Sequence, residues 1–179
     1  MPTYLALLRG INVSGQKLIP MERLRASFEN LGFSEVETYI QSGNGVFQSA
    51  RESTATVAQK ITDRILNDFG FAVPVIGRTQ AEFGEVVKKN PFLAEAAIDL
   101  SKLHVTFLSA AAPPTATEGL QTLAAATERF RVCGREIYLH FPEGYGVTKL
   151  SNRAIEKKLS VSATTRNWNT VSTLLAMAR

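Results

Sequence analysis

The chain has 179 residues, of which 45% are hydrophobic, and a formal net charge of +4. This length supplies one sizeable core or two small ones. No apolar run approaches the roughly 20 residues that a membrane helix needs, so we expect no membrane partner. The opening residues MPTYLALLRG predict a strand rather than a signal peptide, because no basic region precedes the apolar stretch. The single cysteine, Cys133, excludes an internal disulfide and indicates a cytoplasmic location.

The charge is unevenly distributed along the chain. Residues 1–128 hold 11 basic and 13 acidic side chains, whereas residues 129–179 hold 9 basic and 3 acidic ones. A basic C-terminal third attracts phosphate, nucleic acid or an acidic surface. At this modest net charge, however, scattered basic residues on an ordinary protein surface are the favoured interpretation.

The first 78 residues predict the element order β-α-β-β-α-β. Apolar runs and alternating patterns predict four strands, and apolar residues at helical spacing predict two helices between them. The strands begin near Tyr4, Val36, Val46 and Phe71, and the helices cover about residues 21–31 and 57–69. This is the ferredoxin-like order, in which two helices lie on one face of an antiparallel sheet.

The remaining residues predict a second unit of similar order. A helix at about residues 81–89 is followed by a strand at 103–107, a helix at 118–127, a hairpin of strands at 130–132 and 137–141, a helix at 152–159 and a final helix with Asn169 as candidate N-cap. The predicted fold class is therefore α+β, with two ferredoxin-like subdomains that have antiparallel sheets and helices packed on one face. The predicted boundaries are residues 1–78, a connecting helix and loop over 79–101, and residues 102–179.

The stretch RGINVSGQK, residues 9–17, partly matches the phosphate-binding loop G-x-x-x-x-G-K-[ST]. Gln16 occupies the position of the lysine, no Ser or Thr follows it, and the next helix begins too late, near Pro20, to hold a phosphate. These departures exclude a nucleotide triphosphatase loop. Backbone N–H groups flanked by Arg9 and Lys17 can still bind an anion, although a plain strand-to-helix connection is favoured from this stretch alone.

A second polar stretch, TYIQSGN, covers residues 38–44. Turn chemistry explains Gly43 and Asn44, because glycine and asparagine adopt the positive φ angles of tight turns. It does not explain Gln41, since an amide at a strand end has no turn preference. The stretch alone is a weak signal of function.

A third polar stretch, TTRNWNT, covers residues 164–170 and precedes a predicted helix. Arg166 can grip a phosphate or carboxylate with two hydrogen bonds, at a helix N-terminus that also favours anions. Trp168, the only tryptophan, can stack on a base, but core packing is its favoured interpretation. Arg166 and Asn167 have no equally good structural explanation.

Conventional catalytic and metal-binding patterns are missing from the sequence. His104 and His140 fall in strand patterns, with no cysteine or carboxylate at metal-ligand spacing. The nucleophile pattern G-x-S-x-G does not occur. The sequence therefore predicts no metal and no cofactor, assigns no catalytic residue, and leaves open whether the protein is an enzyme.

Three motifs in order, LLRGINV, TYIQSGN and TTRNWNTV, resemble the bacterial family known as domain of unknown function 1697. The resemblance extends from Tyr4 to about Leu175. It implies a compact α+β fold of two subdomains and implies no activity. The family pattern has Gly-Gly where this chain has Ser14-Gly15, and an asparagine near Gln16, so no role is carried over to Gln16.

We expect the three polar stretches to meet at one cleft between the subdomains and to bind a small anion that carries phosphate or carboxylate. The candidate ligand-binding residues come from these stretches and from one further basic position: Arg9, Gly10, Asn12, Lys17, Gln41, Ser42, Asn44, Lys149, Arg166 and Asn167. Two alternatives stay open. One is an RNA- or other nucleic-acid-binding module, in which Tyr4 and Phe47 stack on bases. The other is a scaffold whose polar motifs hold the fold together without a ligand. The oligomeric state stays undefined.

Overall fold

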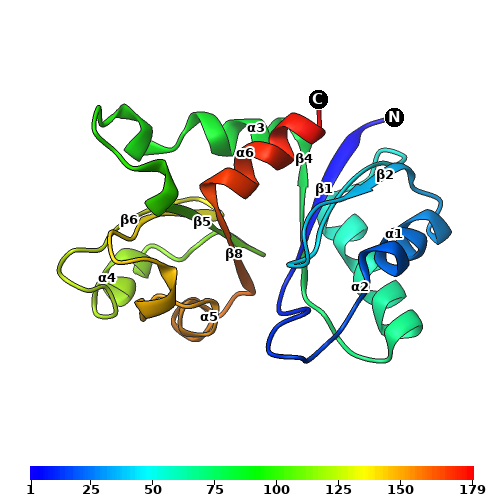
Figure 1. Ribbon diagram of the computed structural model, residues 1–179, viewed down its shortest axis with the longest axis horizontal. Coiled ribbons are helices and arrows are strands. Elements are labelled where there is room, and N and C mark those ends of the chain that lie inside the picture. The colour runs from blue at the N-terminus through cyan, green and yellow to red at the C-terminus, as the bar shows by residue number, and fades with distance from the viewer. The chain divides into compact units, whose positions relative to one another are not determined.

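The computed structural model describes all of residues 1–179, which form two compact units (Figure 1). The first unit comprises Met1–Glu85 with Leu174–Arg179, and the second comprises Val86–Thr173. Each unit contains one four-stranded sheet, in which every strand pair is antiparallel. The predicted α+β class with two antiparallel sheets is confirmed. No helix has the length and apolar character needed to cross a bilayer.

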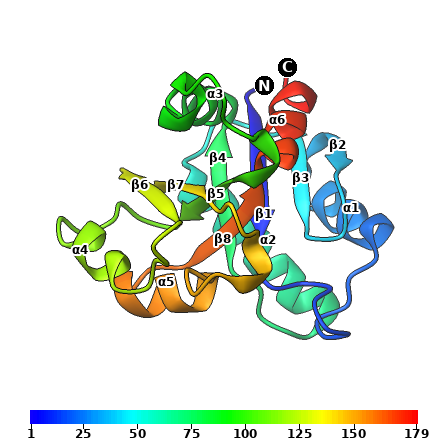
Figure 2. The same cartoon turned by 60° about the vertical axis from the view of Figure 1, so that its left-hand side comes forward.

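The first unit follows the predicted order β-α-β-β-α-β. Its elements are β1 (Thr3–Leu8), α1 (Met21–Asn30), β2 (Ser34–Thr38), β3 (Asn44–Gln48), α2 (Thr54–Phe69) and β4 (Val75–Thr79). The strand order is β2-β3-β1-β4, so that β1 lies between β3 and β4 (Figure 2). Leu7 pairs with Asn44 on one side, and Leu8 pairs with Val75 on the other. The C-terminal end of β1 is therefore flanked by β3 on one side and by β4 on the other.

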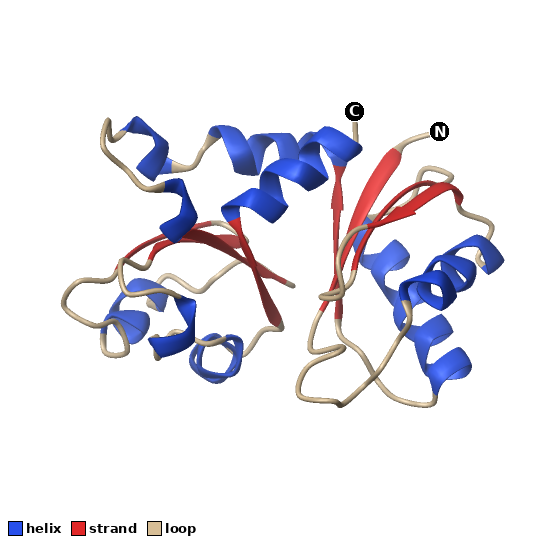
Figure 3. Cartoon of the chain, in the orientation of Figure 1, coloured by secondary structure: helices blue, strands red, loops and turns tan.

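Helices α1 and α2 cover one face of this sheet (Figure 3). Alternate residues of β1 point to that face, because side chains along a strand alternate between the two sides of the sheet. Tyr4, Ala6 and Leu8 accordingly join one buried cluster with Phe28 of α1 and Ile61 of α2. The cluster fixes the strand ends on which the candidate site is built.

The second unit repeats this order. Its strands and helices are β5 (Leu103–Leu108), α4 (Ala116–Gln121), β6 (Arg129–Cys133), β7 (Glu136–His140), α5 (Asn152–Leu159) and β8 (Ala163–Asn167), with short 3-10 turns η1 (Pro91–Ala94), η2 (Leu100–Lys102) and η3 (Tyr145–Val147). The strand order β6-β7-β5-β8 corresponds to that of the first unit, with β5 in the position of β1.

A helix follows the last strand of each repeat without an intervening loop. Helix α3 (Gln80–Lys88) continues from β4, and α6 (Trp168–Met177) continues from β8. Thr79 and Glu82 form a capping box at the start of α3, since each side chain bonds the other residue's backbone N–H at 2.9–3.1 Å. The Asn167 side chain accepts the N–H of Thr170 at 2.8 Å and is the cap of α6.

Four details differ from the sequence-based expectations. Helix α4 ends at Gln121, whereas the sequence predicted a helix that continues to residue 127. Strand β8 was not predicted, because ATTRN lacks the apolar pattern of a strand, yet it pairs with β5 along its length. The cap of α6 is consequently Asn167 rather than Asn169. The fourth strand begins at Val75 rather than near Phe71, whose ring instead lies 6.2 Å from that of Phe69.

Candidate functional site

The first two polar stretches lie together at the C-terminal end of β1, in the first unit. The backbone N–H of Leu8 donates to the Gly43 carbonyl at 2.9 Å, and the N–H of Arg9 donates to the Pro74 carbonyl at 3.0 Å. Arg9 is therefore positioned between the β2–β3 loop and the segment that leads into β4. We call the loops over residues 9–19, 39–43 and 71–74 the β1 end.

The stretch with the partial phosphate-loop pattern forms a miniature hairpin. The N–H of Gln16 donates to the Val13 carbonyl at 3.0 Å, and the N–H of Asn12 donates to the Lys17 carbonyl at 3.1 Å. Ser14 and Gly15 at its tip have φ angles of 53° and 72°. Positive φ at both central residues is the geometry of the two-residue type I′ turn. The stretch is thus no nucleotide triphosphatase loop, in agreement with the sequence analysis.

Asn12 joins the first two polar stretches. Its amide nitrogen donates to the carbonyl of Gln41 at 2.8 Å and to that of Ile19 at 3.1 Å, and its oxygen accepts the N–H of Ile19 at 2.8 Å. Asparagine is also among the residues that tolerate the φ of 54° found here. One side chain therefore closes its own loop and attaches the neighbouring loop to it.

Two more candidate residues bond to nearby backbone. The Lys17 ammonium donates to the Ala72 carbonyl at 2.9 Å, which ties the hairpin to the segment before β4. The buried Asn44 amide donates to the Tyr39 carbonyl at 2.8 Å and to the Ser42 hydroxyl oxygen at 3.1 Å. These contacts hold the geometry of the β1 end, so that part of the polar signal in the sequence is structural.

Backbone strain is concentrated in these loops. Of the six residues other than glycine with positive φ, four lie here: Asn12, Ser14, Lys17 and Ile40. Ile40 is the most unusual, because a β-branched residue at φ 49° is a genuine outlier. Gly43 at φ 89° is required for packing as well, since a Cβ atom there would lie 2.6 Å from Ile11 Cδ1. Such strain often marks functional sites.

The surface of the β1 end is cationic and partly apolar. Its loops carry Arg9 and Lys17 and contain no Asp or Glu. Val13, Leu18 and Ile40 are 58%, 62% and 46% exposed on the same loops. Gln41 is exposed and Arg9 is half-buried. The β1 end therefore combines two basic side chains and an exposed amide with exposed apolar residues.

The remaining candidate residues belong to the second unit. Arg166 on β8 is buried and donates to the Thr164 hydroxyl at 2.7 Å and to the Thr165 carbonyl at 3.0 Å. Burial lowers the pKa of Arg166 to about 10, so the guanidinium stays charged at neutral pH. Asn167 caps α6, and Lys149 is exposed between η3 and α5.

The two aromatic residues considered for base stacking are in the core. Tyr4 and Phe47 are 2% and 0% exposed, and their ring centroids lie 6.1 Å apart in a stacked pair. The Tyr4 hydroxyl donates to the Glu52 carbonyl at 2.7 Å and accepts the Glu52 N–H at 2.9 Å. These rings face the helices and are not available to stack on bases.

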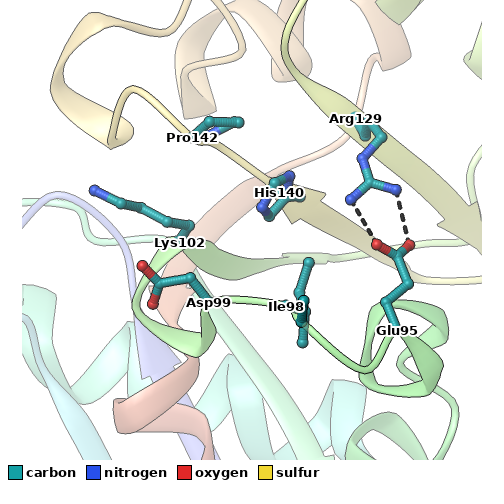
Figure 4. A pocket seen from close by; sticks show the side chains of 8 residues that line it. Glu95, Ile98, Asp99, Lys102, Arg129, His140 and Pro142 are labelled. Carbon is teal, nitrogen blue, oxygen red and sulfur yellow. Dashed lines mark hydrogen bonds and ion pairs between the residues drawn. The ribbon is translucent and has the colours of Figure 1, made fainter.

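A pocket in the second unit was missed by the sequence analysis (Figure 4). It has a volume of about 410 Å³, and its lining contains four charged residues and a histidine: Glu95, Asp99, Lys102, Arg129 and His140. Arg129 pairs with His140 across the β6–β7 hairpin. The turn at Gly134 fixes which residues of β6 and β7 lie opposite each other. The pairing of Arg129 with His140 could therefore have been deduced from the sequence. No group of three or more residues in the chain could hold a metal ion.

Comparisons with known proteins give a family and a fold. The family model described as "Protein of unknown function (DUF1697)" matches residues 1–138. The solved structure of a conserved bacterial protein from Streptococcus pneumoniae matches with a TM-score of 0.78 and 24% sequence identity, over 99% of each chain. At this identity the likeness shows the fold alone. The comparison with curated proteins finds no match.

Proposed function

Because this chain belongs to the DUF1697 family of proteins of unknown function, we propose its function from its own geometry: the β1 end binds a small anion that carries phosphate or carboxylate. The observation that carries the proposal is the bond from Asn12 to the Gln41 carbonyl, 2.8 Å long. It holds together two loops that are far apart in sequence, at the strand end where Arg9 and Lys17 lie.

Charge supports an anion over other ligands. The loops of the β1 end contain two basic residues and no carboxylate of their own. A guanidinium such as that of Arg9 matches phosphate and carboxylate with two parallel hydrogen bonds. Lys17 adds a second positive charge on the same group of loops, and the exposed Gln41 amide adds a neutral donor.

Strain supports a binding role over a purely structural one. A scaffold needs Asn12 and Asn44, whose side chains bond to backbone, but it gains nothing from placing Ile40 at positive φ on an exposed loop. Strain of about 1–3 kcal/mol at such a residue persists only where the surrounding structure maintains it, and this is common at ligand sites. Loops fixed before binding also lose less entropy when the ligand arrives.

A thermal-shift experiment with a matched variant tests the proposal. Inorganic phosphate, pyrophosphate, citrate and a short oligonucleotide are added to the wild type, to Arg9→Gln and to Arg51→Gln. Arg51 is an exposed cation that follows β3 at the opposite end of the sheet. An anion at 100 times its dissociation constant stabilises by about 2.7 kcal/mol, which is roughly 5–10 °C for a chain of this size.

We expect this shift in the wild type and in Arg51→Gln, and its loss in Arg9→Gln. Equal shifts in the two variants, or no shift from any small anion, would overturn the proposal. A shift from the oligonucleotide alone that disappears at high salt would favour the nucleic-acid alternative, because phosphate contacts release counterions.

A further inference from the structure

The pocket of the second unit has one wall formed by Arg129 and Glu95. Two parallel bonds of 2.8 Å join the guanidinium to the carboxylate, and Arg129 Cζ lies 5.0 Å above the Phe92 ring. The opposite charges of the two side chains balance each other. They therefore shape the pocket and contribute no net charge to its contents.

Asp99 and Lys102 lie on the other side of His140 (Figure 4). One carboxylate oxygen of Asp99, Oδ1, accepts the Ser101 N–H at 3.0 Å and the Ser101 hydroxyl at 2.7 Å. These bonds, with a smaller effect from the charge of Lys102, lower the pKa of Asp99, so it is ionised at neutral pH. No hydrogen bond joins Asp99 to Lys102, and this leaves Asp99 Oδ2 and the Lys102 ammonium as two opposite, unpaired charges at one pocket.

His140 lies between these two sides of the pocket. It pairs with Arg129 on β6 and with Leu103 on β5, so the end of the sheet fixes its position. Burial and, next, the charge of Arg129 lower the pKa of His140 below 6.5, whereas the more weakly acting charges of Glu95 and Asp99 raise it. The ring is thus neutral at pH 7, and its Nδ1 is buried without a partner.

We propose that this pocket binds a small zwitterion of the amino-acid type, with its ammonium group at Asp99, its carboxylate at Lys102, and an apolar side chain against Ala97, Ile98 and Pro142. The lining matches each part of such a ligand: one free anion, one free cation, one neutral imidazole and three apolar residues. A volume of about 410 Å³ falls within the range of small-molecule pockets, roughly 300–1,000 Å³. This site is separate from the β1 end, because all of its residues belong to the second unit.

Ligand-observed NMR on the full chain tests the proposal with L-leucine as probe. Two analogues each remove one charge: 4-methylpentanoate lacks the ammonium group, and 3-methylbutylamine lacks the carboxylate. Asp99→Asn and Lys102→Gln remove the matching charges on the protein. Asn at position 99 keeps the oxygen that accepts from Ser101, so the turn at η2 is retained. Glu118→Gln and Lys157→Gln are the controls, since both residues are exposed and lie outside the pocket.

We expect saturation transfer to leucine, and affinity about tenfold or more weaker for either analogue and for either pocket variant, as the loss of one charged hydrogen bond predicts. The controls bind as the wild type does. The proposal is overturned if leucine shows no saturation transfer. It is equally overturned if both analogues bind as well as leucine, or if Asp99→Asn and Lys102→Gln behave as the controls.

Discussion

The side-chain amide of Asn12 donates to the main-chain carbonyl of Gln41 at 2.8 Å. This hydrogen bond attaches the second polar stretch to the first. The two residues are 29 positions apart in sequence. Together with its two bonds to Ile19, this contact makes Asn12 the residue that organises the β1 end.

We predict that Asn12→Gly lowers the free energy of unfolding by about 1–3 kcal/mol, because it leaves backbone groups of Ile19 and Gln41 without their partner. Glycine adopts positive φ without strain, so the loss reports the hydrogen bonds and not the backbone angle. Urea unfolding measures it. Asn30→Gly, at the exposed end of α1, is the control for chain entropy. A loss no larger than that of the control would show that the Asn12 bonds do not stabilise the fold.

Gly43→Ala should be much more destabilising than Gly15→Ala. Both glycines have positive φ, where alanine costs about 1–2 kcal/mol. Only at Gly43 would the new methyl group lie within 3 Å of neighbours, at 2.6 Å from Ile11 Cδ1 and 2.9 Å from Leu8 Cβ. Overpacking adds about 1–3 kcal/mol there. Equal midpoints for the two variants in urea would contradict the packing found at Gly43.

Ile40→Gly should stabilise the protein, although most substitutions destabilise. Removing a β-branched residue from φ 49° recovers about 1–2 kcal/mol, and the added entropy of glycine in the unfolded chain offsets about 0.5–1 kcal/mol of it. The matched variant Leu66→Gly removes a similarly exposed residue from α2 and should destabilise by about 1 kcal/mol. Thermal unfolding that ranks both variants below the wild type would show that Ile40 is not strained.

Stability should fall as the pH is lowered through the range in which histidine titrates. Burial lowers the pKa of His104 below its ordinary value of 6.5, so the native state binds fewer protons than the unfolded state. A lowered pKa gives stability that is present above pH 6.5 and is lost as the pH falls through the folded-state pKa. His104→Phe keeps a ring next to Tyr145, whose centroid is 5.2 Å away. Its midpoint should therefore fall less than that of the wild type between pH 7.5 and 5.5. An equal fall would exclude His104 as the cause.

The sequence predicted most of the first unit because its apolar spacing is regular and its helix ends carry glycine or proline. Strand β8 escaped prediction, since Thr164, Thr165 and Asn167 are polar and their strand conformation comes from pairing with β5. Because β8 was not predicted, its last residue, Asn167, was not recognised as the cap of α6. Long-range pairing of this kind has no local signal for a sequence pattern to report.

The polar motifs were recognised correctly as unusual, but the sequence could not separate their roles. Asn12 and Asn44 bond to backbone, which a pattern of residue types does not reveal. The pocket around His140 was missed because its residues come from three separate stretches, 95–102, 129 and 140–142, none of them polar enough to stand out. Only the register of the β6–β7 hairpin joins two of them, Arg129 and His140.

A ¹H–¹⁵N NMR titration of the full chain with inorganic phosphate and with citrate tests whether the β1 end binds anions. We predict saturable shifts of backbone amides in residues 9–18 and 40–43 for at least one of these anions. We also predict that Arg9→Gln abolishes these shifts and Arg51→Gln preserves them. If neither anion moves these amides, or if the shifts survive in Arg9→Gln, the β1 end is not an anion site.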